Sequence, residues 1–149
     1  MTTKNVIALL AITAGTALAM PASANDIRFY ARNGCAGPVI FRYATNVVAS
    51  DNCKASRNRC SGQNDEARSV WMPNSGPWSL IVYDSPDGRS DDDYAEIRSP
   101  PVPHPSGGVC VATFEVRANS PMARMVTFHR NNGLDGKVSR VAVNSIRLR

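Results

Sequence analysis

The residues whose chemistry the sequence constrains most are four cysteines, Cys35, Cys53, Cys60 and Cys110. An even number in a small chain that begins with an export signal, described below, indicates disulfide bonds. Three complete pairings are open, and spacing alone does not choose among them. Cys110 is the only cysteine in the second half of the chain, so any complete pairing ties that half to the first. A zinc site is not indicated, because there is no Cys-x-x-Cys motif and only two histidines are present.

No set of residues matches a known catalytic motif. The sequence has no Gly-x-Ser-x-Gly, no His-Glu-x-x-His and no phosphate-binding glycine loop. His104 lies among prolines, His129 ends an expected strand, and nothing places a nucleophile beside either. Glu66, Glu96 and Glu115 leave open a carboxylate pair for glycoside cleavage, because sequence spacing does not fix separation in space. The sequence therefore favours a protein that is not an enzyme, with a small secreted hydrolase as an alternative.

A basic loop is the clearest candidate contact surface. Lys54, Arg57 and Arg59 lie between Cys53 and Cys60 with no acidic residue among them. A positively charged surface attracts anionic partners, so an extracellular protein or an anionic surface is the expected partner. The chain lacks the alternating aromatic and basic residues that bind single-stranded nucleic acid, so nucleic acid is not favoured.

The first 24 residues have the organisation of a cleavable secretory signal peptide. Lys4 is followed by an apolar run over 6–19 and by the small residues Ala22-Ser23-Ala24. Cleavage after Ala24 leaves 125 residues with 16 Lys and Arg against 12 Asp and Glu, a net charge of +4. No later stretch is apolar enough to span a bilayer. We expect one domain over 25–149, secreted or periplasmic.

The mature chain has the pattern of an all-β protein. No segment keeps a 3.6-residue period, and short alternating runs are separated by turn signals such as Asn33-Gly34. The segment 49–63 is polar and bears two cysteines, which predicts a disulfide-stapled loop, and 99–105 is a proline-rich surface loop. We expect strands over 26–31, 38–43, 67–72, 78–83, 109–116, 125–129, 138–143 and 146–148. Such a series is typical of a β-sandwich or barrel.

A repeated arrangement accompanies these strands. Tyr30 is followed by Cys35 and Gly37 in the first hairpin, and Asn64-Asp65-Glu66-Ala67-Arg68-Ser69 follows later. Asp135-Gly136-Lys137-Val138-Ser139 precedes another strand near the end. This resembles the βγ-crystallin domain, in which each of two Greek-key motifs has an aromatic-x-x-x-x-aromatic-x-Gly hairpin and a later Asn/Asp-Asn/Asp-x-x-Ser/Thr-Ser stretch. The resemblance implies a β-sandwich of two Greek-key motifs, over about 27–72 and 78–148.

The sequence departs from that pattern in both hairpins. Cys35 replaces the second aromatic residue of the first hairpin, and Gly88 stands five residues after Tyr83 in the second. An unrelated small β-sandwich is therefore the alternative. In either case glycine allows the positive φ of a tight hairpin, and a serine after the acidic pair can bind the backbone of that hairpin.

The resemblance also implies a calcium site, because many members of the family bind calcium through the paired acidic stretches. An ion would lie near Asn64, Asp65, Asp135 and Ser139, with backbone carbonyls completing its shell. Arg68 occupies the hydroxyl position of the first stretch, where it would repel a cation or replace it. The alternative is that the stretches are structural turns. The Asp91-Asp92-Asp93 run is expected to be a solvated loop.

These observations favour an exported, non-enzymatic structural or binding module with calcium as its only candidate cofactor. A secreted protease inhibitor or toxin-like protein is the alternative implied by small exported relatives of this fold.

Overall fold

The computed structural model describes residues 26–45, 47–73, 78–98, 107–115, 119–120, 123–129 and 132–145. The expected signal peptide, the proline loop with His104 and the strand over 146–148 lie outside the described residues. The described residues form ten strands and no helix: β1 Asp26–Arg32, β2 Ala36–Ala44, β3 Ala49–Asn52, β4 Ser69–Pro73, β5 Trp78–Tyr83, β6 Tyr94–Arg98, β7 Gly108–Val111, β8 Asn119–Ser120, β9 Ala123–His129 and β10 Arg140–Ser145.

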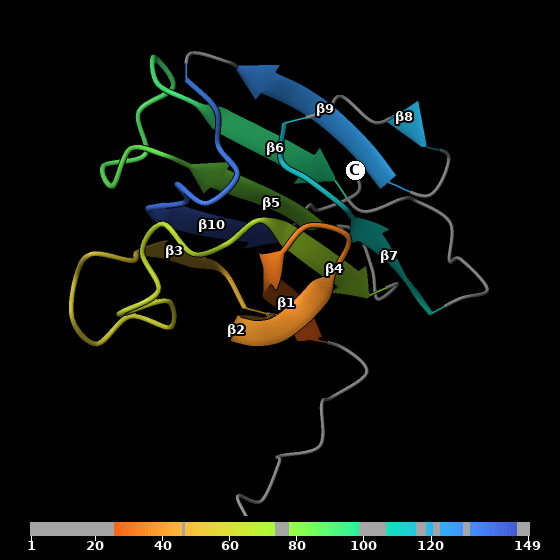
Figure 1. The fold of residues 1–149 in the computed structure, drawn as a ribbon, viewed down its shortest axis with the longest axis horizontal. Helices are drawn as coiled ribbons and strands as arrows, with labels where there is room; N and C mark the ends of the chain where they lie inside the picture. Colours follow the sequence, from red (N-terminus) through yellow and green to blue (C-terminus); the bar gives the residue numbers. More distant parts are fainter. Residues whose placement is uncertain are drawn as a thin grey trace, which may run out of the picture.

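The strands form two antiparallel sheets packed face to face (Figure 1). One sheet has the order β2-β1-β4-β7 and the other the order β3-β10-β5-β6-β9-β8. In the first half β1, β2 and β4 lie together, whereas β3 pairs with β10 of the second half. In the second half β5, β6 and β10 lie together and β9 and β8 extend their sheet, whereas β7 pairs with β4 of the first half. The expected all-β sandwich of two Greek-key motifs is confirmed, and the exchanged strands interlock its halves.

Alternating side chains fill the space between the sheets. In β1, Ile27 and Phe29 point inward while Arg28 and Tyr30 are half-buried on the outer face. Phe29 stacks on Phe41 with ring centroids 4.4 Å apart. Both sheets and the connecting segments contribute to one buried cluster, including Val70, Met72, Leu80, Val82, Ile97, Phe114, Leu134, Val141 and Val143. This single core fixes the ends of the strands from which the loops project.

Several sequence expectations need correction. The segment 49–63 is not all loop, because β3 occupies its first four residues and pairs with β10. β6 and the short β8 were not expected from the sequence, and β7 ends at Val111 rather than at 116. The Asp91–Asp93 run is only partly solvated, because Asp93 is fully buried. Its carboxylate accepts hydrogen bonds from the backbone amides of Asn132 and Gly133, a long-range role that local pattern cannot reveal.

Both disulfides form. Cys35 pairs with Cys110 and Cys53 with Cys60, so the expected link between the two halves of the chain is present. Disulfides persist in oxidising compartments, which indicates that this protein works outside the reducing cytoplasm. No helix long and apolar enough to cross a membrane occurs in the part of the chain that the structure describes.

Candidate functional site

The two acidic stretches cross each other beside the ends of β4 and β10. The backbone amide of Asp65 donates to the carbonyl of Val138 at 3.1 Å. In the equivalent contact of the other stretch, the backbone amide of Gly136 donates to the carbonyl of Ala67 at 2.9 Å. Asp65 and Gly136 are each the second residue of their stretch, so the two stretches are related by an approximate two-fold axis.

The same symmetry relates each stretch to a hairpin. The amide of Arg68 donates to the carbonyl of Tyr30 at 3.0 Å, and the amide of Ser139 donates to the carbonyl of Tyr83 at 2.8 Å. Tyr30 lies two residues before the end of β1 and Tyr83 is the last residue of β5, and these are the first strands of the two hairpins. As a result of these contacts and the crossing, Arg68 lies next to Gly136 and Ser139 lies next to Asp65. In each case the fifth residue of one stretch lies beside the second residue of the other.

One half of this crossing collects oxygen atoms. The Ser139 hydroxyl donates to a carboxylate oxygen of Asp65 at 3.2 Å and lies 3.5 Å from the carbonyl oxygen of Lys137. The amide group of Asn64 donates to the other oxygen of Asp65. The Asn64 side-chain oxygen is buried and has no hydrogen-bond partner among the described residues. Three of the four expected calcium ligands therefore lie together.

This half also carries excess negative charge. Burial raises the pKa of the Asp84 carboxyl group, and the negative charges of Asp92, Asp65 and Asp93 raise it further, while Lys137 opposes them. The ammonium group of Lys137 is held by Asn132 through its backbone and side-chain oxygens. A cation near Asp65 would relieve the repulsion that Asp84 feels.

The symmetry-related half has the opposite character. Gly136 stands where the other half has Asp65, and Arg68 stands where it has Ser139. The Arg68 guanidinium group packs over Gly136, so that a Cβ atom on residue 136 would lie 2.8 Å from Nη2. Arg68 makes no ion pair with any acidic residue that the structure describes. This half offers neither carboxylate nor hydroxyl to a metal ion, and calcium does not fit it.

The fourth expected ligand, Asp135, has a structural role instead. One of its oxygens accepts from the amide of Phe114 at 2.8 Å, and the other accepts from Thr113 and Asn33 at 2.6 and 2.9 Å. In the opposite direction, the Glu115 carboxylate accepts hydrogen bonds from the backbone amides of Leu134 and Asp135. Asp135 therefore joins the segments around 114 and 134, and its part in a calcium site stays a prediction.

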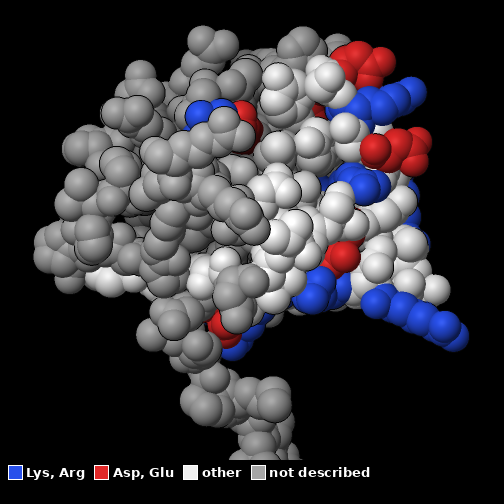
Figure 2. Space-filling view, turned by 180° about the vertical axis from the view of Figure 1, so that it is seen from behind, with Lys and Arg blue, Asp and Glu red and all other residues white. Residues whose placement is uncertain are grey.

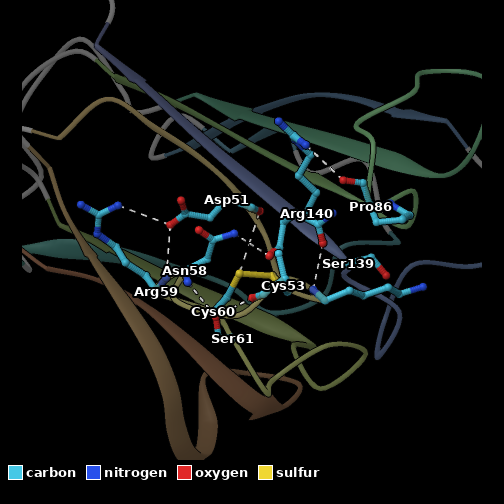
Figure 3. The surroundings of a disulfide bond; sticks show 12 residues. Asp51, Cys53, Asn58, Arg59, Cys60, Ser61, Pro86, Ser139 and Arg140 are labelled. Carbon is cyan, nitrogen blue, oxygen red and sulfur yellow. Dashed lines mark hydrogen bonds and ion pairs between the residues drawn. A yellow bond between two sulfur atoms is a disulfide. The ribbon is translucent and has the colours of Figure 1, made fainter.

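Serine and arginine clamp the two hairpins from equivalent positions. Ser69, fully buried, donates to the carbonyl of Arg32 at 2.5 Å and accepts from the amide of Cys35 at 2.9 Å. This confirms the expected contact between the serine and the folded hairpin. In the second motif Arg140 takes the equivalent place and donates to the carbonyl of Pro86 at 3.1 Å (Figure 3).

The basic loop between Cys53 and Cys60 lies against β3 and the start of β10. Its disulfide is buried, and the amide of Cys53 donates to the carbonyl of Ser139 at 2.8 Å (Figure 3). Lys54, Arg57 and Arg59 are all exposed, as expected for a contact surface. The loop is thus attached directly to the stretch that carries Ser139.

Among the described residues, no three His, Cys, Asp or Glu side chains are grouped closely enough to hold a metal ion by themselves.

Comparison with protein-family models, with curated proteins and with solved structures finds no match to this chain.

Proposed function

We propose that this protein is an exported, non-enzymatic structural or binding module of the βγ-crystallin type, with one weak calcium site at Asp65 and Ser139. Residues 1–24 are its signal peptide. The observation that carries the proposal is the symmetric crossing of the two acidic stretches, which sets the Asp65 carboxylate against the Ser139 hydroxyl.

The strand topology supports the assignment to this family. Two Greek-key motifs exchange their third strands, and each hairpin is clamped from the residue that follows the fifth position of an acidic stretch. The second half uses Arg140 where the family pattern has serine, so the clamp is retained with different chemistry.

The use of the carboxylates supports a non-enzymatic role. Asp93, Glu115 and Asp135 each accept hydrogen bonds from backbone amides and thereby hold the segment 132–136 in place. These hydrogen bonds give the three carboxylates a structural role. Of the glutamates that the sequence offered as acid or base candidates, Glu115 is therefore part of the framework.

The donor set supports one weak site. Calcium takes six to eight oxygen ligands, and here Asp65, Ser139 and the Lys137 carbonyl would contribute, with Asn64 beside them. Because the site has few carboxylate ligands, its affinity for calcium falls in the range of extracellular modules, with Kd of about 10⁻⁴ to 10⁻³ M. Calcium would add rigidity where the two halves cross.

Calcium should raise the melting temperature of the wild-type protein. At ten times Kd, binding to the folded state alone adds about 1.4 kcal/mol, which shifts the melting temperature by roughly 5 °C in a domain of this size. Asp65→Asn should remove most of the shift, because it deletes the carboxylate that accepts from the Ser139 hydroxyl. Asparagine is the suitable replacement, since it tolerates the positive φ of 64° at this position.

Thermal melts of both proteins with calcium, with magnesium and with a chelator test this proposal. An Asp65→Asn protein that responds to calcium as strongly as the wild type would contradict the site. A wild-type protein that is unaffected by 10 mM calcium would leave the acidic stretches as structural turns.

A further inference from the structure

The loop from Cys53 to Cys60 is rigidly framed. The side-chain amide of Asn58 donates to the carbonyl of Asn52 at 2.8 Å. The backbone amide of Asn58 donates to the hydroxyl oxygen of Ser61 at 2.7 Å. The Ser61 hydroxyl in turn donates to the carbonyl of Ala55 at 2.7 Å. Together with the buried disulfide, these bonds hold the backbone in one shape (Figure 3). A fixed loop loses little conformational entropy when it binds.

The basic side chains of this loop are presented outward. Arg59 is oriented by Asp51, 3.3 Å away, and by the ring of Tyr43, whose centroid is 5.6 Å from the guanidinium carbon. Lys54 and Arg57 are exposed and have no acidic partner among the described residues. Basic side chains protrude on the side of the molecule where this loop lies, with acidic side chains between them (Figure 2).

Arg57 adopts an unfavourable backbone conformation. Its φ of 75° lies in the left-handed region, which arginine rarely occupies and which glycine or asparagine would occupy at lower cost. Strain of this kind persists where the surrounding structure enforces it, and it is concentrated at functional sites. The loop therefore keeps a guanidinium group at a position that stability alone would not select.

The surroundings of the loop narrow the kind of partner. Protein interfaces depend on a central aromatic or apolar anchor, and the exposed residues of this loop supply none. Tyr43, the aromatic residue against Arg59, is 1% exposed and cannot stack on a nucleic acid base. No large apolar side chain projects from 53–60 to enter a lipid layer. Only charge remains as the basis of recognition.

We propose that Lys54, Arg57 and Arg59 form a binding surface for an anionic polysaccharide outside the cytoplasm. Carboxylate or sulfate groups spaced along such a polymer would pair with Lys54 and Arg57, while Arg59, already held by Asp51, adds a third fixed donor. This surface is distinct from the calcium site, so either can exist without the other.

The test is retention on a heparin column and direct titration with heparin at about 0.15 M salt. The double variant Lys54→Gln/Arg57→Gln should bind about 30-fold more weakly, because each surface cation contributes roughly 1 kcal/mol toward an anionic surface and 1.4 kcal/mol is a factor of ten. The control, Arg89→Gln/Arg98→Gln, removes the same charge from exposed arginines that pair with Asp91 and Glu96, and should bind as the wild type does.

Arg57→Gly separates binding from folding. It removes both the charge and the strained φ, so it should weaken heparin binding while leaving the melting temperature equal or higher. Equal losses in both double variants, or no retention of the wild type, would overturn the proposal. Competition by duplex DNA or anionic vesicles at lower concentrations than heparin would also overturn it, by assigning the surface to a different partner.

Discussion

Replacing Cys35 and Cys110 together by alanine should lower the free energy of unfolding by about 4–5 kcal/mol. The bond closes a loop whose ends are 75 residues apart, and the chain-entropy relation gives about 4.5 kcal/mol for a loop of this length. It also links the first hairpin covalently to β7, which belongs to the second half of the chain but pairs with β4 in the first sheet. Its loss therefore weakens the contact between the two halves.

Equilibrium unfolding in urea measures this effect, and a second route provides its control. Cys110 is exposed and Cys35 half-buried, whereas Cys53 and Cys60 are at most 1% exposed. A mild reductant should therefore open Cys35–Cys110 first in the folded protein, and alkylation of that product should reproduce the loss seen in the double variant. A loss below about 1 kcal/mol by both routes would show that the bond does not organise the fold, since loops of this length are worth several kcal/mol.

Ser69→Ala should lower the free energy of unfolding by about 2–3 kcal/mol. The hydroxyl is the partner of both the Arg32 carbonyl and the Cys35 amide, and it is fully buried. Removing it leaves two backbone groups of a tight hairpin without that partner, at about 1–3 kcal/mol for each group that water cannot reach.

Ser139→Ala is the matched control. Ser139 is 1% exposed and lies at the neighbouring position of the second stretch, but its hydroxyl donates to the exposed carboxylate of Asp65. Its loss should cost less than about 1 kcal/mol, because a carboxylate that reaches water can replace the bond. Urea denaturation of both variants compares them. Equal stabilities of Ser69→Ala and the wild type would contradict the role assigned to the clamp.

The hairpin clamp could be predicted from the sequence because each of its two parts has a recognisable pattern, although they lie 34 to 37 residues apart. Gly37, at a φ of 75°, and the serine after the acidic pair stand at the expected spacings, and most strands follow from alternation of apolar residues. β3 could not be predicted in the same way, because its residues Ala49–Asn52 have short or polar side chains and show no apolar alternation. Its pairing with β10 joins segments far apart in the sequence.

The candidate site was predicted only in part, since its geometry depends on contacts between distant segments. Asp135 has the spacing of a ligand but is held by residues near 114, which sequence spacing does not reveal. The sequence also suggested that Arg68 would interfere with the calcium site directly. The crossing instead places Arg68 over Gly136, in the half that lacks the carboxylate, so Arg68→Ser alone should not strengthen calcium binding at Asp65.

Calcium titration by calorimetry tests the central claim most directly, when the wild type is compared with the double variant Arg68→Ser/Gly136→Asp. Gly136 has a φ of 77°, close to the 64° that Asp65 already adopts at the equivalent position, so aspartate is tolerated there once Arg68 no longer fills the space. The account predicts one calcium ion per wild-type chain, one in Arg68→Ser and two in the double variant. Absence of binding heat in the wild type up to 10 mM calcium, or a double variant that binds no more calcium than the wild type, would contradict it.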